Sequence, residues 1–287
     1  MPELPEVETI RRGLAPVLTG ARLARVTARR PDLRFPLPHR FAERMTGVRI
    51  EALDRRAKYL LARLDQGETF VAHLGMSGRF EIADAGGSNG AGRFARAVAP
   101  DPRHAHVVFE TEAGARVTFY DPRRFGYMAL VPTAALGEHP WFRGLGPEPL
   151  GPGFDGELLE CALAGRRAPI KTALLDQRLV AGLGNIYVCE ALHRARLAPD
   201  RAAGSIPRRR LARLAQAIKS VLEEAIEAGG STLRDYASAE GGLGYFQHSF
   251  AVYGRAGEPC LRRGCGGAIR RSVQSGRSTF ACDRCQA

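Results

Sequence analysis

From Gly20 to Leu130 the chain alternates short apolar and polar runs, as the strands of a half-buried sheet do. One helix is expected before them, from about Glu6 to Leu18, with Pro5 in its first turn. The runs end at Gly, Pro or Asp and predict strands at Leu23–Ala28, Val48–Leu53, Tyr59–Leu64, Phe70–Leu74, His106–Glu110 and Arg116–Tyr120. The pattern therefore predicts a mostly β first domain, a sandwich with a helix at its start.

The pattern turns helical after a stretch rich in Gly and Pro at residues 132–154, which favours an interdomain linker. Short helices are expected at Gly156–Ala164, Ile170–Gln177 and Asn185–Arg196. A longer helix begins at Pro207, ends at Gly229-Gly230 and carries Leu211, Leu214, Ile218, Leu222 and Ile226 on one face. Residues 83–100 have no apolar period and predict a flexible loop. The fold class is thus α+β, and the expected parts are residues 1–132, a linker at 133–154, and residues 155–250 and 251–287.

Length and charge narrow the class of protein. A chain of 287 residues is long enough for two domains, each with its own core. The net charge of +12 points to a polyanionic partner such as nucleic acid, although a merely basic soluble protein has the same signature. No run approaches the ~20 apolar residues of a membrane span, and the start MPELPEVETI lacks the apolar region of a secretory signal. We therefore expect a cytoplasmic protein without a membrane partner.

The cysteines are unevenly placed. Four of the six lie near the end of the chain, as Cys260-x4-Cys265 followed by Cys282-x2-Cys285. Two close pairs separated by a hairpin-sized loop can hold one tetrahedral Zn²⁺, and four cysteines leave no open coordination position for catalysis. One structural zinc is therefore predicted. The arginines of the intervening loop, Arg270, Arg271 and Arg277, suit contact with phosphate.

A turn between two expected helices is a weaker signal. Gly182-Leu183-Gly184 leads into the helix that begins at Asn185. Backbone N–H groups at such a turn, and at a helix N-terminus, can bind a phosphate. Helices joined by a Gly-rich turn are also common without any ligand, so the turn alone leaves both readings open.

Several motifs in one order resemble the formamidopyrimidine-DNA glycosylase family along essentially the whole chain. These motifs are Pro2-Glu3-Leu4-Pro5-Glu6-Val7-Glu8, Arg55-Arg56-Ala57-Lys58-Tyr59-Leu60, His73-Leu74-Gly75-Met76-Ser77-Gly78, Asp121-Pro122-Arg123-Arg124-Phe125-Gly126, Gly182-Leu183-Gly184-Asn185-Ile186-Tyr187 and the cysteine cluster. The resemblance implies an N-terminal catalytic β-sandwich at 1–132, a helix–two-turn–helix DNA-binding domain at 155–250 and a zinc finger at 251–287. It also implies that DNA lies between the two domains.

The implied activity is excision of oxidised purines from double-stranded DNA, followed by strand cleavage. Removal of Met1 gives Pro2 a free secondary amine, and an α-amino group with an ordinary pKa of about 7.7–8.0 is partly neutral at working pH. Pro2 is then the implied nucleophile, which forms a Schiff base with the sugar. Glu3 is the implied general acid, a role that needs a carboxyl holding its proton, although Glu3 could equally cap the first helix. Lys58 is implied as a proton donor in β-elimination, and Arg277 as the phosphate-gripping arginine that supports δ-elimination.

The other implied residues contact DNA. Met76, Arg123 and Phe125 match a wedge that fills the space left by a flipped nucleotide, with Arg123 donating hydrogen bonds to the opposite base. Further implied contacts are His104, Arg166, Lys171 and Asn185. Strand alternation would place His104 and His106 on one face, and Arg166 could equally belong to a solvated turn. His73 is expected to be structural, and residues 237–245 to cap the lesion.

Two alternatives remain open. One is an enzyme resembling endonuclease VIII, which acts on oxidised pyrimidines; its start usually has a glycine where Leu4 stands here. The other is a non-catalytic zinc-finger DNA-binding protein, which explains the charge and the cysteines but not the N-terminal motif. We expect the protein to act as a monomer at the nucleoid.

Overall fold

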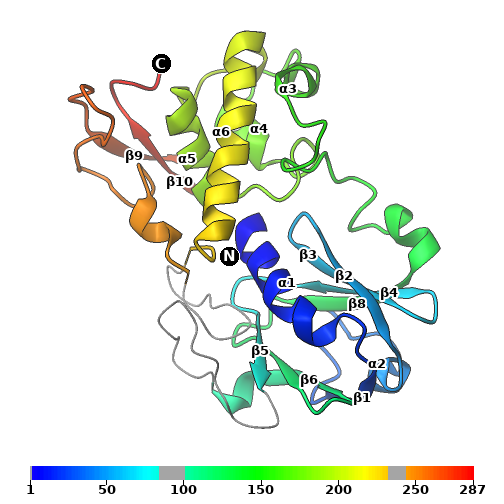
Figure 1. Ribbon diagram of the computed structural model, residues 1–287. Coiled ribbons are helices and arrows are strands. Elements are labelled where there is room, and N and C mark those ends of the chain that lie inside the picture. The colour runs from blue at the N-terminus through cyan, green and yellow to red at the C-terminus, as the bar shows by residue number, and fades with distance from the viewer. Residues whose placement is uncertain (1, 84–100, 232–243) are drawn as a thin grey trace. The chain divides into compact units, whose positions relative to one another are not determined.

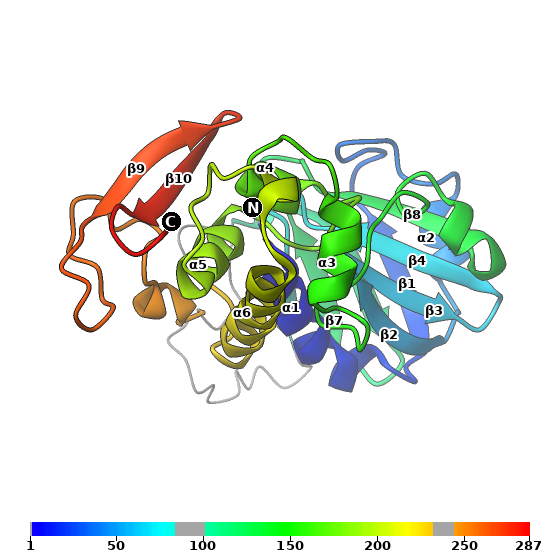
Figure 2. The ribbon, with the colours of Figure 1, turned by 90° about the horizontal axis from the view of Figure 1, so that it is seen from above.

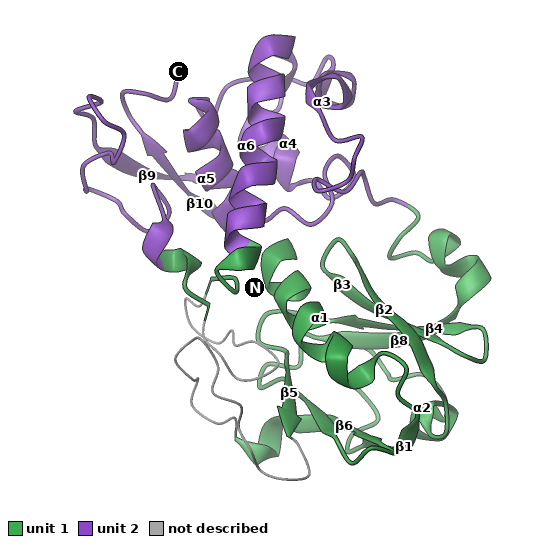
Figure 3. Cartoon of the chain, viewed as in Figure 1, with its two compact units in different colours: residues 1–143, 226–247 green, residues 144–225, 248–287 purple. Residues whose placement is uncertain are grey.

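The computed structural model of the chain describes residues 2–83, 101–231 and 244–287 (Figure 1). The chain divides into two compact units, each made of two stretches (Figure 3). Unit 1 is Met1–Arg143 with Ile226–Gln247, and unit 2 is Gly144–Ala225 with His248–Ala287. The expected flexible loop after Ala83, and most of the expected lesion-capping segment at 237–245, lie outside the described residues.

Unit 1 is built on two antiparallel four-stranded sheets. The first has the order β1 (Leu23–Ala28), β6 (Ala105–Thr111), β7 (Arg116–Tyr120) and β5 (Arg79–Ala83). The second has the order β2 (Ile50–Arg56), β3 (Tyr59–Leu64), β4 (Glu68–His73) and β8 (Tyr127–Pro132). Two helices accompany the sheets, α1 (Leu4–Leu18) and α2 (Phe41–Met45).

One apolar core joins the two sheets. Phe109 of β6 and Phe70 of β4 meet in it, with ring centroids 5.6 Å apart. Helix α1 adds Ile10 and Leu14, both buried, to the same core. The structure thus confirms the sandwich with a helix at its start, and β1, β3 and β7 have the bounds expected from the sequence.

The sequence pattern did not predict three elements of unit 1. Strand β8 reads as a continuous apolar run, and β5 and α2 have only five residues each, too short for a period to stand out. The expected linker at 133–154 is not a free connection either. Trp141 lies in unit 1, where its ring stacks on Tyr59 at 6.2 Å and meets Tyr127 edge-on at 4.6 Å.

Unit 2 holds the remaining helices, α3 (Gly156–Leu163), α4 (Ile170–Leu175), α5 (Asn185–Ala195) and most of α6 (Arg208–Glu227). All four were expected close to these bounds, and the apolar face of α6 from Leu211 to Ile226 is buried as predicted. The unit ends in the hairpin of β9 (Ile269–Gln274) and β10 (Arg277–Cys282), in which β10 packs against α5 (Figure 2).

Short 3-10 turns complete the described elements: η1 (Pro102–His104), η2 (Thr133–Glu138), η3 (Ala203–Ser205) and η4 (Phe246–Ser249). Within the described ranges 2–83, 101–231 and 244–287, no helix combines the length and apolar character that crossing a bilayer requires.

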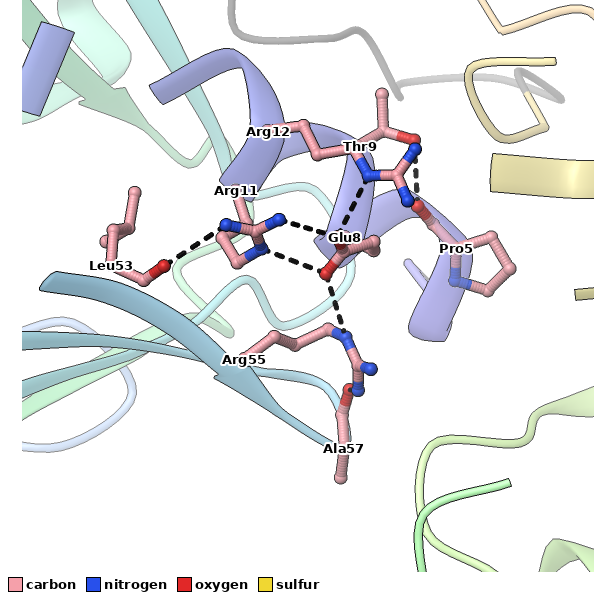
Figure 4. A network of polar contacts seen from close by, with 8 residues as sticks. All are labelled: Pro5, Glu8, Thr9, Arg11, Arg12, Leu53, Arg55 and Ala57. Carbon is pink, nitrogen blue, oxygen red and sulfur yellow. Dashed lines mark hydrogen bonds and ion pairs between the residues drawn. The ribbon is translucent and has the colours of Figure 1, made fainter. Parts of the chain in front are cut away.

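A buried glutamate ties α1 to β2 (Figure 4). Both oxygens of Glu8 accept hydrogen bonds from Arg11, at 2.8 and 3.0 Å, and one also accepts from Nε of Arg55 at 3.2 Å. The same two arginines donate to backbone carbonyls, Arg11 to Leu53 at 3.2 Å and Arg55 to Ala57 at 3.0 Å. Glu8 therefore fixes the first helix against the end of β2 and the turn that follows it.

The charge of Glu8 is stabilised by its neighbours. Burial alone would raise the pKa of this carboxyl, but hydrogen bonds from Arg11 and Arg12 and the charge of Arg55 outweigh burial and lower it. A lowered pKa in the folded state means that the ionised form contributes to stability. That contribution is complete above the unfolded pKa and is lost as the pH falls through the folded pKa.

Replacing Glu8 by Gln is expected to lower the free energy of unfolding at pH 7 by about 1–2 kcal/mol, because three guanidinium groups lose a shared carboxylate. The difference in the free energy of unfolding between wild type and Glu8→Gln should narrow once the pH falls below 4.5, the ordinary pKa of the glutamate carboxyl. Urea unfolding across this pH range measures it. The matched control is Glu43→Gln, which removes an ion pair with Arg40 whose two side chains are each 64% exposed, and should cost under about 0.5 kcal/mol. Equal losses in the two variants would contradict the assignment.

Candidate active site and nucleic-acid interface

The start of α1 gathers buried polar groups. Pro2 and Glu3 precede the helix and are buried, with Glu3 at the N-cap position. The N–H of Glu3 donates to one oxygen of Glu6 at 2.8 Å, and the other oxygen of Glu6 accepts the N–H of Ser231 at 2.8 Å. Glu6 thus joins the first residues of the chain to the segment after α6. Sequence reasoning assigned it no role, although a glutamate three residues after an N-cap is the signature of a capping box.

Lys58 occupies the tight turn between β2 and β3. Ala57, the other residue of the turn, has a φ of +51°, and its carbonyl is held by Arg55. The side chain of Lys58 is only 7% exposed. Lys58 is therefore not a solvated residue at a strand edge, because the turn directs its side chain into the unit. Through Arg55 and Glu8, the same turn is connected to α1 (Figure 4).

His73 lies at the end of β4, close to this turn. Its Nδ1 accepts the N–H of Gly75 at 3.0 Å, and its ring stacks on Tyr127 with centroids 4.7 Å apart. Burial, followed by the positive charges of Lys58 and Arg34, lowers the pKa of His73 to about 4. The imidazole is therefore neutral at working pH, and its contacts are those of the structural role expected for it.

The three expected wedge residues stand on two loops of unit 1. Met76 and Phe125 are among the few large apolar side chains that are exposed, at 39% and 40%. The guanidinium of Arg123 lies 4.8 Å from the centroid of the Phe125 ring. Exposed apolar bodies beside an arginine are the features that insertion into a base stack requires.

His104 and His106 do not share a strand face. Asp101 accepts the N–H of Arg103 and caps the 3-10 turn η1, so that His104 belongs to this turn and is half-buried. His106 is buried in β6, where its Nε2 lies 2.9 Å from the carbonyl oxygen of Asp121. The expected alternation is therefore wrong, because a turn rather than a strand precedes Ala105.

In unit 2, the four clustered cysteines form a metal site. Their sulfur atoms all lie within 4.8 Å of one another, with 3.9 Å between Cys260 and Cys285 and 3.5 Å between Cys265 and Cys282. Tetrahedral zinc with bonds of ~2.3 Å places its sulfur ligands roughly 3.8 Å apart. The donor set and its spacing therefore fit one structural zinc, as predicted.

A buried glutamate holds the chain that leads into the finger. Glu190 of α5 is completely buried, and its oxygens accept the N–H groups of Ala251, Val252 and Tyr253 at 2.9, 3.0 and 2.8 Å. Charge-assisted bonds to backbone N–H groups are stronger than neutral ones. The path of residues 251–253 is thereby fixed to α5, a contact that sequence reasoning missed.

Lys171 and Asn185 converge on the finger hairpin. The ammonium of Lys171 donates to the carbonyl of Ser278 at 3.0 Å and to the hydroxyl of Thr279 at 2.8 Å, and Asn185 Nδ2 donates to the same carbonyl at 2.9 Å. Lys171 is completely buried. The ammonium is turned to the hairpin and not to solvent, and the expected contact of Lys171 with DNA stays a prediction. Asn185 Oδ1 is buried without a hydrogen-bond partner, which leaves it able to accept one.

Arg277 and Arg166 are both exposed in unit 2. Arg277 begins β10, next to the carbonyl that Lys171 and Asn185 hold. Arg166 follows Gly165, whose φ is +68°, and its Nε donates to the carbonyl of Ala162 at 2.9 Å. Arg166 therefore caps the end of α3, and its exposed position fits either a solvated turn or a phosphate contact.

Three family models match the chain in order. The formamidopyrimidine-DNA glycosylase N-terminal domain matches residues 1–128, the formamidopyrimidine-DNA glycosylase H2TH domain residues 145–237, and the zinc finger found in FPG and IleRS residues 257–287. The first match covers the sandwich up to the start of β8, and the third covers the four cysteines. Together with the fold, these matches define the class of protein, a DNA glycosylase with a zinc finger.

Relatives extend the match to the full length. A protein from Phenylobacterium zucineum named formamidopyrimidine-DNA glycosylase is 67% identical, and one from Caulobacter vibrioides with the same name is 63% identical, each over the whole of both chains. The chain belongs to the formamidopyrimidine-DNA glycosylase family. Among solved structures, the MutM (Fpg) protein of Thermus thermophilus is 42% identical with a TM-score of 0.83, covering 99% of this chain and 98% of that one. The Lactococcus lactis Fpg bound to DNA with an abasic site is 32% identical with a TM-score of 0.86, covering 99% of each.

Breaking the zinc site is expected to weaken DNA binding. Cys265→Ser removes a buried ligand, and the chain should then hold less than one zinc ion. Because the hairpin carries Arg270, Arg271 and Arg277, its loss should reduce affinity for duplex DNA by about tenfold or more at low salt. Zinc content by atomic emission and a fluorescence binding titration measure the two effects. Cys161→Ser, which alters an exposed cysteine outside the cluster, should leave both unchanged. Full affinity in a zinc-free Cys265→Ser protein would exclude this role for the finger.

Proposed function

We propose that this protein removes oxidised purines, such as 8-oxoguanine and formamidopyrimidines, from duplex DNA and then cleaves the strand at the abasic site. Its full-length relatives are named formamidopyrimidine-DNA glycosylase, and solved Lactococcus lactis relatives are complexes with DNA that contains Fapy-dG or an abasic site. The observation that carries the proposal is the start of α1. There Pro2 is followed at once by buried Glu3, with buried Glu6 one turn further along α1, in a chain that matches its relatives over its full length.

The first step is base excision. After removal of Met1, the neutral nitrogen of Pro2 attacks the sugar C1′, and the bond from C1′ to the base breaks, so that the base leaves with the electron pair. Glu3 protonates the ring oxygen of the deoxyribose as the ring opens. The proton lost by the amine balances the charge on the departing base, and a cationic iminium joins Pro2 to C1′. The burial of Glu3 keeps this proton transfer away from bulk water.

The second step is strand cleavage. The iminium makes a C2′ proton acidic. As water takes this proton, a C2′–C3′ double bond forms, the C3′–O bond breaks, and the 3′ phosphate leaves in β-elimination. Lys58 supplies the proton to that leaving group, a role suited to a compact ammonium on a rigid turn. A second, δ-elimination passes the C4′ proton to water, forms a C4′–C5′ double bond and breaks the C5′–O bond, so that the 5′ phosphate leaves. Arg277, exposed on the finger hairpin, holds the phosphates in place for it.

We infer that the remaining contacts position the duplex. Met76, Arg123 and Phe125 replace the flipped nucleotide in the stack, which offsets the few kcal/mol that unstacking costs. His104 and Arg166 contribute phosphate contacts, as does the amide of Asn185. The one zinc ion is structural and holds the finger. The protein acts as a monomer in the cytoplasm, at the nucleoid where its substrate lies, and a sedimentation measurement at micromolar concentration checks the oligomeric state.

The decisive experiment traps the iminium. Wild-type protein, incubated with a duplex containing 8-oxoguanine opposite cytosine and reduced with borohydride, is expected to give a covalent protein–DNA adduct. Pro2→Glu should give none, because a bulky second residue retains Met1 and the nitrogen of residue 2 stays an amide. Pro5→Ala is the matched control, since the nitrogen of Pro5 is an amide in every form of the protein, and it should keep the adduct. A wild-type protein that binds the duplex but forms no adduct would exclude the enzyme in favour of a DNA-binding protein.

The choice of lesion is tested with the same assay. An oxidised pyrimidine in place of 8-oxoguanine should give an adduct at least about tenfold more slowly, the discrimination that a few differing hydrogen bonds in a closed pocket provide. Mass spectrometry of the adduct should place the link on the N-terminal peptide. A faster reaction with the pyrimidine would move the protein to the endonuclease VIII type of activity.

A further inference from the structure

The wedge residues come from two loops that are distant in sequence. Met76 stands in the loop 74–78 between β4 and β5, and Arg123 and Phe125 stand in the loop 121–126 between β7 and β8. We refer to them as the wedge loops. Neither contains a helix or strand residue of its own, so secondary structure alone does not fix one loop against the other.

A buried serine and a buried aspartate join the wedge loops. The hydroxyl of Ser77 donates to one oxygen of Asp121 at 2.6 Å and accepts the backbone N–H of Arg123 at 3.2 Å. The other oxygen of Asp121 accepts the N–H of Gly126 at 2.7 Å. Asp121 is completely buried and Ser77 nearly so. Ser77, the residue after Met76, is therefore bonded directly to Arg123 and is linked through Asp121 to Gly126, the residue after Phe125.

The backbones of the wedge loops are in direct contact. A Cβ atom on Gly75 would lie 2.2 Å from the carbonyl carbon of Phe125, and one on Gly126 would lie 2.8 Å from the ring of Phe119. His106 holds the other side of the assembly, with its Nε2 2.9 Å from the carbonyl oxygen of Asp121. Close packing and hydrogen bonds together leave the two loops no room to move separately.

We propose that Ser77 and Asp121 are positioning residues that hold Met76, Arg123 and Phe125 as one preformed wedge, and thereby set how well the enzyme distinguishes the base opposite the lesion. The proposal rests on the proposed function, in which Arg123 donates to that base. Neither residue reaches DNA itself, because both are buried beneath the exposed side chains that they hold.

The position of Arg123 matters because cytosine and adenine present different hydrogen-bonding groups to its guanidinium. The Watson–Crick edge of cytosine offers a guanidinium two neighbouring acceptors, O2 and N3, whereas adenine offers the acceptor N1 beside an amino donor. Arginine donates in a fixed planar fork, so its advantage with cytosine depends on correct aim. If the loop carrying Arg123 loosens, the paired contact with cytosine is lost first. The single contact with adenine tolerates the change.

The test compares single-turnover excision of 8-oxoguanine opposite cytosine and opposite adenine. Ser77→Ala should lower the ratio of the two rates by about fivefold, the factor that one hydrogen bond is worth. Cleavage of a duplex that already contains an abasic site should change by less than about twofold, because Pro2 and Lys58 are untouched and no base has to be removed. Ser77→Thr, which keeps the hydroxyl, should restore the ratio. If Ser77→Ala is unstable, Asp121→Asn tests the same bridge, since it weakens the bond from Ser77 without removing side-chain volume.

The matched control is Thr111→Val. The hydroxyl of Thr111 is also buried and also makes two hydrogen bonds, to the carbonyl and from the N–H of Ala115, but it lies at the β6–β7 hairpin. It should lower the thermal midpoint as Ser77→Ala does and leave the ratio unchanged. An unchanged ratio in folded Ser77→Ala and Asp121→Asn proteins that still form the borohydride adduct would overturn the positioning role. Absence of the adduct in the wild type would instead overturn the proposed function.

Discussion

The functional loops depend on buried carboxylates that accept backbone N–H groups from distant parts of the chain. Glu6 holds Ser231, Asp121 holds Gly126, and Glu190 holds the chain from Ala251 to Tyr253. Loops outside helices and strands leave backbone donors that must find partners when buried. A carboxylate satisfies several such donors at once, and its bonds are stronger than those of a neutral group. Each of these carboxylates therefore fixes a segment that regular secondary structure leaves unsupported.

These carboxylates also explain how a unit can hold exposed side chains in fixed positions. In unit 1 the groups that would meet DNA are exposed, as at Met76 and Phe125, while the groups that hold them are buried, as at Ser77 and Asp121. Removing a buried partner leaves an unsatisfied polar group and costs more than the bond itself contributes. The supporting residues are therefore expected to tolerate substitution less well than the exposed residues that they hold. In unit 2 the same relation holds between exposed Arg277 and buried Lys171.

The sequence predicted the elements of the fold better than the contacts between them. The bounds of β1, β3 and β7 and the buried face of α6 follow from periodicity. A helix or strand with a buried face has apolar residues at a regular spacing within its own sequence. The zinc site could be predicted for a similar reason, since its ligands form two local pairs. The bond from Ser77 to Asp121 spans 44 positions and that from Ser231 to Glu6 spans 225, and no local pattern records such a pairing. His104 shows the opposite error, in which a local alternation was overridden by the turn at Asp101.

Two of the chain's lysines are buried, and for one of them the shape of the side chain explains why a lysine stands there. The basic residues of this chain are almost all arginine, with lysine only at Lys58, Lys171 and Lys219, and an amine can lose its proton where a guanidinium cannot. Lys58 and Lys171 do occupy special places, since both are buried. For Lys171, however, the reason is shape. Its compact ammonium fits beneath the hairpin and meets a carbonyl and a hydroxyl, where the broad fork of a guanidinium would need more room. Burial lowers the pKa of Lys171, Cys189 acts in the opposite direction, and the charge of Arg277 adds to the lowering. Lys171 thus holds the two residues that follow Arg277 in β10, and thereby the start of the hairpin strand that carries Arg277.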